Sequence, residues 1–415
     1  MDVLKIATAG SVDDGKSTLI GRLLYDTKSL TTDKLEAIKN KSEQLGYDYL
    51  DFSLATDGLV AEREQGITID VAHIYFSTQN RSYIIADTPG HIEYTRNMVT
   101  GASTSQASII LIDARKGVIE QTYRHFFINN LLRVKDIVVA INKMDLVDYS
   151  EEVFNSIKSE FEALIAKSDY QEQNITFIPI SALQGDNVVT ASAKTEWYNG
   201  QTILQHLEQL NNEDIYNVGT PRFPVQYVVR PKTEDFHDFR GYAGKVYGGE
   251  LSVGDDVVVL PSQKTSKIKD ILVYDESYKT GSRRSSVTIT LEDDINISRG
   301  DMLVKVNDLP TIDKQCNAIV SWMDSEPLQE GGKYTIQHGV HKVLAKVNSI
   351  QHRIEPDFSG VDEAVSSLNL NDIALVNFKF NKPLYYDAFK AHRTNGSFIV
   401  IDNQTNNTVG AGFIQ

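Results

Sequence analysis

The segment Gly10–Ser17, with the sequence Gly-Ser-Val-Asp-Asp-Gly-Lys-Ser, places glycines, a lysine and a hydroxyl at the spacing of a phosphate-binding loop. An apolar, strand-like run precedes it and a helical pattern follows it, and in this context backbone N–H groups can wrap an anion. Lys16 would offset charge on β- and γ-phosphates, and the Ser17 hydroxyl would ligate Mg²⁺. The residues that we expect to bind the phosphates are Gly10, Ser11, Asp13, Asp14, Gly15, Lys16, Ser17 and Thr18.

A second polar segment, Ile85-Ala-Asp87-Thr-Pro-Gly90-His91, begins at the end of another strand pattern. Nucleotidases with a phosphate-binding loop need an aspartate here to hold the hydration shell of Mg²⁺, which we assign to Asp87. The Gly90 N–H would then sense the γ-phosphate, and His91 would orient the attacking water. A single histidine is usually structural, but its position four residues after Asp87 favours the catalytic interpretation.

The segment Glu64–Asp70 lies between these two motifs, where a mobile switch must offer a hydroxyl to Mg²⁺ when γ-phosphate is present. We assign this hydroxyl to Thr68. The predicted catalytic residues are therefore His91, Lys16 and Thr68, and the predicted metal-site residues are Ser17, Thr68 and Asp87.

Two further segments predict how the base is selected. Asn142-Lys143-Met144-Asp145 follows a Val/Ile-rich strand, and the Asp145 carboxylate can accept hydrogen bonds from both N1–H and N2–H₂ of guanine. Adenine would leave that carboxylate unpaired, so the contact selects GTP over ATP. Ser181-Ala182-Leu183 ends the next strand pattern, where backbone N–H groups can reach the guanine O6. The predicted base-binding residues are Asn142, Lys143, Asp145, Ser181, Ala182 and Leu183, and the predicted cofactors are GTP and Mg²⁺.

Strands that alternate with helical stretches must position these motifs in residues 1–212, and this alternation predicts a parallel, doubly wound α/β sheet. The expected strands are Val3–Ala9, Val71–Ser77, Tyr83–Asp87, Ser108–Asp113, Ile137–Asn142 and Ile175–Ser181. After Pro221 the pattern changes to period-2 runs separated by turns, which indicates an all-β region too long for one small barrel. We therefore predict an α/β P-loop GTPase domain over 1–212 followed by two all-β barrel domains over 213–308 and 309–415.

Composition limits the cellular setting and the partners. The 415 residues carry 41 Lys+Arg against 56 Asp+Glu, a formal net charge of −15, which disfavours loose binding to nucleic acid or anionic membranes. The apolar runs are too short to cross a membrane, and the first residues enter a strand pattern without the features of a signal peptide. The single cysteine, Cys316, fits a reducing compartment. We expect a cytoplasmic protein that binds neither nucleic acid nor membrane.

The motifs resemble a known class. Residues 1–212 resemble the G domain of the translation-factor class of GTPases, and the two expected barrels resemble the same class. Elongation factors typically carry histidine in the phosphate-binding loop where this chain has Ser11 and Asp14. The loop instead resembles that of the GTPase subunits of bacterial sulfate adenylyltransferase. Further segments are similar to that family: Glu62–Asp70, Tyr94–Met98, Asp113–Gly117, Ile141–Ser150, Phe223–Tyr227, Phe239–Gly244, Ile297–Asp301 and Thr408–Gly412.

The resemblance implies that GTP hydrolysis on this chain drives synthesis of adenosine 5′-phosphosulfate and diphosphate from ATP and sulfate, in sulfate assimilation. We find no Ser-Gly-Gly-x-Asp-Ser type loop after a strand, so the adenylyl-transfer site is expected on a partner, the ATP-pyrophosphatase-like subunit 2 of sulfate adenylyltransferase. Lys194–Tyr198 lacks the Met-Pro typical of the family before Trp-Tyr, and we expect this departure to affect only surface contacts.

A translation factor that carries aminoacyl-tRNA under control of GTP is the alternative, because architecture alone does not determine function. Asp14 in the phosphate-binding loop and the lack of an evident basic strip speak against it.

Overall fold

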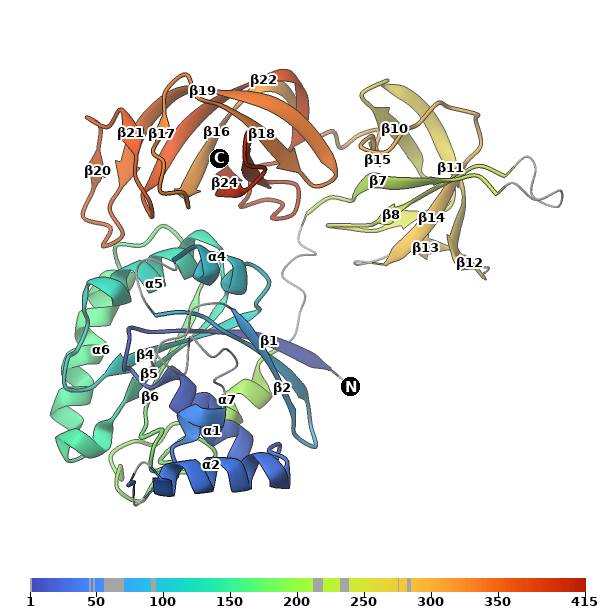
Figure 1. The fold of residues 1–415 in the computed structure, drawn as a ribbon. Coiled ribbons are helices and arrows are strands. Elements are labelled where there is room, and N and C mark those ends of the chain that lie inside the picture. The colour runs from blue at the N-terminus through green and yellow to red at the C-terminus, as the bar shows by residue number, and fades with distance from the viewer. Residues whose placement is uncertain are drawn as a thin grey trace. The chain divides into compact units, whose positions relative to one another are not determined.

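The structure of this chain is a computed structural model that describes residues 2–44, 46–47, 49–55, 71–90, 95–211, 219–231, 239–274, 276–281 and 285–415. The chain divides into two compact units (Figure 1). The first comprises Met1–Glu213 with Glu355–Gly360, and the second comprises Asp214–Ile354 with Val361–Gln415.

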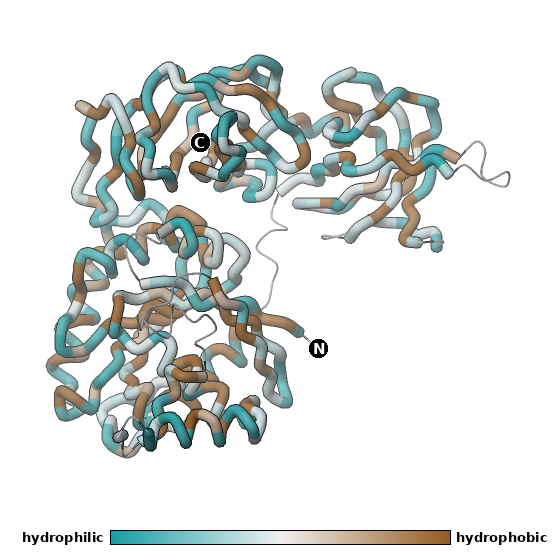
Figure 2. Tube along the Cα trace, in the orientation of Figure 1, coloured by the Kyte–Doolittle hydropathy of each residue, from teal (hydrophilic) through white to brown (hydrophobic). Residues whose placement is uncertain are grey.

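The first unit is built on a six-stranded sheet with the order β2-β3-β1-β4-β5-β6. Its strands are β1 Val3–Ala9, β2 Ala72–Ser77, β3 Ser82–Asp87, β4 Ala107–Asp113, β5 Asp136–Asn142 and β6 Asn174–Pro179. Every residue of β4 is buried, as is expected for a central strand that is covered on both faces. The hydrophobic segments in Figure 2 accordingly follow the inner strands of this sheet.

The strands predicted from the sequence are present, but the sheet is not parallel throughout. β1 pairs in parallel with β3 and β4, and β5 pairs in parallel with β4 and β6. β2 instead pairs antiparallel with β3, so the prediction of an entirely parallel sheet is wrong at this edge. Only the turn at residues 78–81 separates the two strands, and a parallel connection needs a crossover of about a dozen residues or more.

The helices of this unit form where apolar residues recur at helical spacing. Leu19, Ile20, Leu23 and Leu24 of α1 are buried against the sheet together with Ile203 and Leu207 of α7. On the other face, helices α4, α5 and α6 cover the strands (Figure 1). The helices are α1 Lys16–Asp26, α2 Thr32–Gln44, α4 Thr95–Ser103, α5 Glu120–Leu131, α6 Glu151–Ile165 and α7 Ile203–Gln209, with short 3-10 helices η1 Phe52–Ala55 and η3 Met144–Val147.

The second unit contains two sheets whose paired strands run antiparallel, and each sheet closes on itself. In the first sheet the order is β10-β15-β7-β8-β14-β11-β12, and β10 also pairs with β11. Its strands are β7 Arg222–Val229, β8 Gly241–Lys245, β10 Asp256–Leu260, β11 Lys264–Val273, β12 Glu276–Tyr278, β14 Ser286–Leu291 and β15 Met302–Lys305. The short strands β9 Leu251–Ser252 and β13 Thr280–Gly281 pair with each other.

The second sheet of this unit has the order β18-β23-β24-β16-β22-β19-β20 and closes where β18 pairs with β19. Its strands are β16 Thr311–Trp322, β18 Lys333–His338, β19 His341–Ile354, β20 Val361–Asp362, β22 Ile373–Tyr386, β23 Ser397–Asp402 and β24 Thr408–Ile414. A further pair consists of β17 Leu328–Gln329 and β21 Ser367–Leu368. The predicted fold class, an α/β domain followed by two β-barrels, is confirmed, while the domain boundaries at 212 and 308 stay predictions.

Among the helices in the part of the chain that the structure describes, none is long and apolar enough to cross a membrane.

The packing of α1 against η1 gives the first testable prediction. A Cβ on Gly21 of α1 would lie 2.0 Å from the carbonyl oxygen of Phe52 in η1, and no rotamer change can relieve a clash with backbone. We expect Gly21→Ala to lower the free energy of unfolding by a net amount of about 1–3 kcal/mol. The cost of overpacking exceeds the gain in helix propensity, which is about 1 kcal/mol. Denaturant unfolding followed by circular dichroism measures the change.

The matched control is Lys39→Ala at an exposed position of α2, which should leave stability near that of the wild type. A Gly21→Ala variant as stable as the control would contradict the close packing of α1 and η1.

Candidate functional site

The predicted motifs lie at the carboxyl ends of the parallel strands of the six-stranded sheet. Gly10 follows β1, Asp87 ends β3, Asn142 ends β5 and Ser181 lies just beyond β6. These strands run in parallel within the sheet, so their carboxyl ends meet at the same edge. In open α/β sheets this edge is where ligands bind.

The backbone of the phosphate-binding loop depends on glycine at position 15. Gly15 has a φ of +94°, which a residue with a side chain rarely adopts. A Cβ here would also lie 2.5 Å from Nδ2 of Asn142. Glycine therefore allows the loop to turn into α1 while it lies directly against the end of β5.

Lys16, the first residue of α1, points back into the loop. Its Nζ donates hydrogen bonds to the carbonyl oxygens of Gly10 at 2.8 Å and Ser11 at 3.0 Å, and the residue is 7% exposed. Burial lowers the pKa of Lys16, and the negative charge of Asp87 opposes that shift. A positive charge held in a ring of carbonyl oxygens and carboxylates can offset the charge of a bound phosphate.

The end of β3 lies against this loop. Thr8 donates a hydrogen bond from Oγ1 to Asp87 Oδ1 at 2.9 Å, which fixes the carboxylate, and Asp87 is 2% exposed. A Cβ on Gly90 would lie 2.5 Å from both the carbonyl oxygen of Gly10 and Nζ of Lys16. The structure thus brings Asp87 and Gly90 to the loop, while their metal and γ-phosphate roles stay predictions.

Ser11 makes two polar contacts, one within the loop and one to α5. The backbone N–H of Ser11 donates to Oδ2 of Asp14 at 2.6 Å, and the Ser11 hydroxyl bonds to Oε1 of Gln121 in α5. Burial raises the pKa of Asp14, against the lowering effect of the Ser11 hydrogen bond and of Lys16. Asp14 therefore shapes the loop from inside it, whereas Asp13 is exposed.

Asn142 joins the phosphate loop to the segment predicted to bind the base. Its Nδ2 donates to the carbonyl oxygen of Asp14 at 2.7 Å, and its Oδ1 accepts a hydrogen bond from the N–H of Ala182 at 2.9 Å. The side chain is buried, so both of its functional groups are satisfied inside the protein. The Asn142 side chain thereby connects its own segment to the phosphate-binding loop and to the Ser181–Leu183 segment.

The next residue, Lys143, has a left-handed backbone with a φ of 63°, and its Nζ lies 3.0 Å from Oδ2 of buried Asp113. Arg115 donates two further hydrogen bonds to Asp113, at 3.0 and 2.6 Å. Burial would raise the pKa of Asp113, but the hydrogen bonds from Arg115 and Lys143 outweigh burial and hold this pKa well below its usual value. Asp113 therefore stays charged and holds the ammonium group of Lys143.

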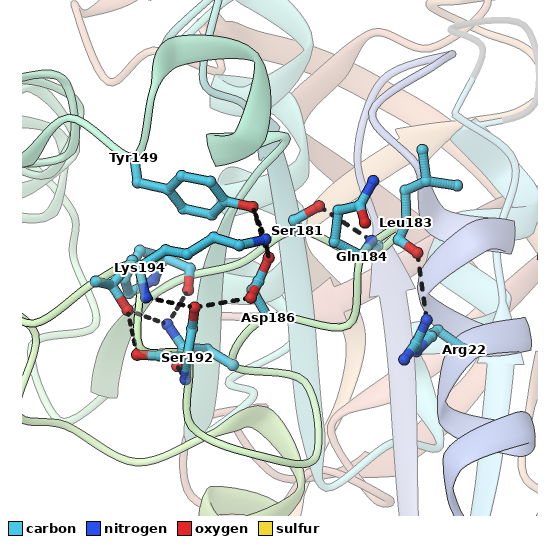
Figure 3. Close-up of polar contacts among 12 residues, drawn as sticks. Arg22, Tyr149, Ser181, Leu183, Gln184, Asp186, Ser192 and Lys194 are labelled. Atoms are coloured by element: carbon cyan, nitrogen blue, oxygen red, sulfur yellow. Dashed lines mark hydrogen bonds and ion pairs between the residues drawn. The ribbon is translucent and has the colours of Figure 1, made fainter. Parts of the chain in front are cut away.

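The remaining base-binding candidates lie beside this network. Asp145 is partly exposed in η3, and the N–H of Met144 donates to the carbonyl oxygen of Ile180 at 3.2 Å. Ser181 and Ala182 are 0% and 1% exposed, and the carbonyl oxygen of Leu183 accepts a hydrogen bond from Arg22 of α1 at 3.3 Å (Figure 3). The predicted nucleotide residues in the described part of the chain therefore gather at one site, while their ligand roles stay predictions.

Two of the predicted catalytic residues cannot be placed. Thr68 and His91 lie outside the described residues. The sequence analysis missed three supporting residues, Arg22, Asp113 and Gln121. The position of Asp113 at the end of a buried strand was a usable signal, whereas nothing local in the sequence links Arg22 to Leu183 or Gln121 to Ser11.

The segment Lys194–Tyr198, whose departure from the family pattern is expected to affect only surface contacts, contacts residues that follow the two predicted base-binding segments. Lys194 Nζ lies 3.1 Å from Oδ2 of Asp186, and Trp197 donates from Nε1 to the carbonyl oxygen of Tyr149 at 3.0 Å. These contacts span up to 48 residues of chain, so the sequence alone could not reveal them.

Comparison with known proteins agrees with this geometry. The family model "Elongation factor Tu GTP binding domain" matches residues 1–213, and "GTP-eEF1A C-terminal domain-like" matches residues 315–415. The solved Ski7 GTPase-like domain of S. cerevisiae, bound to GDP and inorganic phosphate, is similar in fold, with a TM-score of 0.53 and 17% identity over 100% of this chain and 97% of that chain. The chain thus has a P-loop GTP-binding domain of the elongation factor Tu class.

Two relatives identify the family within this class of GTP-binding proteins. "Sulfate adenylyltransferase subunit 1" of Bacteroides fragilis (strain YCH46) is 48% identical over 100% of this chain and 86% of the relative. The protein of the same name from Alteromonas mediterranea is 49% identical over 100% of this chain and 87% of the relative. The chain belongs to the sulfate adenylyltransferase subunit 1 family, the GTPase subunits of that enzyme. The resemblance seen in the phosphate-binding loop is confirmed.

The position of Lys16 yields a test of the phosphate site. Lys16→Ala removes the buried charge that faces the loop interior, so we expect affinity for GTP and GDP to fall at least about tenfold, equivalent to about 1.4 kcal/mol. Lys158→Ala, on the exposed side of α6, is the control and should bind like the wild type. Isothermal titration calorimetry measures both, and tight GTP binding by folded Lys16→Ala protein would show that Gly10–Ser17 is not the phosphate site.

Base selection is tested at Asp145. Asp145→Asn replaces two acceptors with an amide that complements the C2 carbonyl of xanthine, so preference should shift from GTP toward XTP. Asp148→Asn, at an exposed position of the same segment, should keep the preference of the wild type. Competition against a fluorescent guanine nucleotide measures the ratio, and an unchanged ratio in Asp145→Asn would remove Asp145 from the base site.

Proposed function

We propose that this chain is the GTPase subunit of an ATP sulfurylase, in which GTP hydrolysis drives synthesis of adenosine 5′-phosphosulfate and diphosphate from ATP and sulfate. The observation that carries this proposal is the similarity of 48–49% identity over the whole chain to proteins named sulfate adenylyltransferase subunit 1. The geometry at the sheet edge supports the GTP part of it.

The site residues that the structure describes are assigned the following roles in binding GTP. Lys16 and the backbone N–H groups of the loop hold the phosphates. Asn142 connects this loop to the segment at Ala182 through two hydrogen bonds. Asp145 selects guanine, and backbone N–H groups of Ser181–Leu183 meet its O6. Binding at both ends fixes the γ-phosphate in one position, which is the main requirement of phosphoryl transfer to water.

Oxygen donors for Mg²⁺ lie at the same ends of the strands. Asp87 offers a carboxylate that Thr8 holds in place, and Ser17 offers a hydroxyl in the first turn of α1, both of them oxygen donors of the kind that Mg²⁺ prefers. When bound, the ion would neutralise charge on the phosphates. Thr68 is the third residue that we assign to this site, on sequence grounds.

We assign His91 to orienting the attacking water, because it directly follows Gly90, which lies against Lys16 and Gly10. Thr68 and His91 would order around the γ-phosphate and relax after hydrolysis, and this change would be passed to the partner. The partner, an ATP-pyrophosphatase-like subunit 2, would carry out adenylyl transfer. The word "subunit" in the names of the relatives supports the existence of such a partner.

The proposal is tested by mixing the full chain with its candidate subunit 2, ATP and sulfate, and measuring adenosine 5′-phosphosulfate with and without GTP. We expect GTP to raise the product beyond the equilibrium of ATP and sulfate alone. His91→Ala should bind GTP like the wild type but hydrolyse it on the order of 10²-fold more slowly, and the excess product should fall in parallel.

His73→Ala, at an exposed position of β2, is the control and should keep full hydrolysis and full excess product. If GTP still raises the product when His91→Ala abolishes hydrolysis, hydrolysis is not the coupled step. Co-purification with tRNA in place of a second subunit would support the translation-factor alternative.

A further inference from the structure

Tyr149 and Asp186 connect the two segments that we assign to guanine. The Asp186 carboxylate accepts hydrogen bonds from the Tyr149 hydroxyl at 2.6 Å, the Ser192 hydroxyl at 2.7 Å and Nζ of Lys194 at 3.1 Å (Figure 3). Tyr149 belongs to the segment that follows Asp145, and Asp186 closes the loop that starts at Ser181. The hydroxyl–carboxylate contact therefore joins the two segments directly.

The loop that contains Ser181 is closed by hydrogen bonds of its own. The N–H of Ser181 donates to the carbonyl oxygen of Asp186 at 3.2 Å, and the N–H of Gly185 donates to the carbonyl oxygen of Ser181 at 2.7 Å. The Ser181 hydroxyl also accepts a hydrogen bond from the N–H of Gln184 at 3.2 Å. Because Asp186 closes the same ring through its backbone, a shift of its side chain is transmitted to Ser181.

The opposite side of this loop is fixed against α1. Arg22 donates to the carbonyl oxygen of Leu183, and Gly185 has a φ of +86° at a place where a Cβ would lie 2.4 Å from Nη2 of Arg22. The loop is thus attached to Arg22 on one side, to Asn142 through the N–H of Ala182, and to the group around Asp186 on the other side. Tyr149 and Asp186 supply the attachment that joins the far end of the loop to the segment that follows Asp145.

Tyr149 is held in a conformation that its neighbours must enforce. Its φ is 53°, in the left-handed region that bulky residues rarely adopt, and such conformations persist only where surrounding contacts determine them. Here the N–H of Tyr149 donates to the carbonyl oxygen of Met144 at 2.8 Å, and Trp197 donates to its carbonyl oxygen. These contacts aim the hydroxyl at Asp186.

The Tyr149–Asp186 hydrogen bond is charge-assisted, because a neutral hydroxyl donates to an ionised carboxylate. Burial raises the pKa of Asp186, but the hydrogen bonds from Tyr149, Ser192 and Lys194 outweigh burial, so the net pKa lies below its usual value and the carboxylate is ionised at neutral pH. Burial and the hydrogen bond to Asp186 raise the pKa of Tyr149 to about 12, so the hydroxyl keeps its proton. Lys194 is 52% exposed, so water weakens its ion pair.

We propose that Tyr149 and Asp186 form a positioning clamp that holds the Ser181–Leu183 loop against the Asn142–Asp145 segment and so sets how long a guanine nucleotide stays bound. The clamp rests on the proposed function, because it needs both segments to bind the base. Neither side chain is assigned a contact with the nucleotide, so both are positioning residues. The ligand class is the guanine nucleoside di- and triphosphates already assigned to this site.

The experiment measures dissociation of a fluorescent GDP from the full chain by stopped flow, for Tyr149→Phe, Asp186→Asn and the double variant. Tyr149→Phe keeps the aromatic ring and removes only the hydroxyl. We expect each single variant to release GDP on the order of tenfold faster, because one charge-assisted hydrogen bond is lost. The double variant should be no faster than the faster single variant, because both changes break the same contact.

Two controls separate positioning from general loss of structure. Tyr75→Phe, which removes a hydroxyl from an exposed side chain of β2, should change dissociation less than about threefold. Affinity for inorganic tripolyphosphate, which occupies the phosphate loop without a base, should be unchanged in Tyr149→Phe and Asp186→Asn, whereas a disrupted domain would bind both ligands poorly.

Dissociation of GDP within twofold of the wild type in both single variants would overturn the clamp. An equal loss of GDP and tripolyphosphate affinity would also overturn it, since the effect would then not be specific to the base. A wild-type chain that binds no guanine nucleotide would overturn the proposed function itself, so the two failures are distinguishable.

Discussion

A buried ammonium group beside the carboxyl ends of the parallel strands is the feature on which the site depends. Removing a charge from water is costly unless oxygen atoms replace the lost solvation. Lys16 meets that requirement through the carbonyl oxygens of Gly10 and Ser11 and the charge of Asp87. The close approach of Gly90 follows from this packing, because a Cβ at Gly90 would collide with Nζ of Lys16 and the carbonyl oxygen of Gly10.

The Asn142 side chain connects the phosphate-binding loop to the segment that we assign to the base. Asn142 bonds at once to Asp14 in the phosphate loop and to Ala182 in the base loop. Asp113, which the end of β4 places between the ends of β1 and β5, holds the neighbouring Lys143. The segments that we assign to the phosphates and to guanine therefore belong to one hydrogen-bonded network.

The sequence predicted the parts of this site that are local. The motif at Gly10–Ser17 and the apolar runs at β1, β4 and β5 could be identified because each depends on residues a few positions apart. The direction of β2 was missed because alternation of strands with helices does not distinguish a hairpin from a crossover. Tyr149, Asp186 and Arg22 were missed because their partners lie 37 and 161 residues away. Thr68 and His91 stay predictions.

The most direct measurement is the equilibrium binding of GTP and ATP to the wild-type chain at equal Mg²⁺ concentration, by isothermal titration calorimetry. If Asp145 pairs with guanine, which adenine cannot replace, the chain should favour GTP by on the order of 10²-fold or more. A chain that binds ATP and GTP with the same affinity at this site would contradict the assignment of Asn142–Asp145 and, with it, the role of this chain as a GTPase.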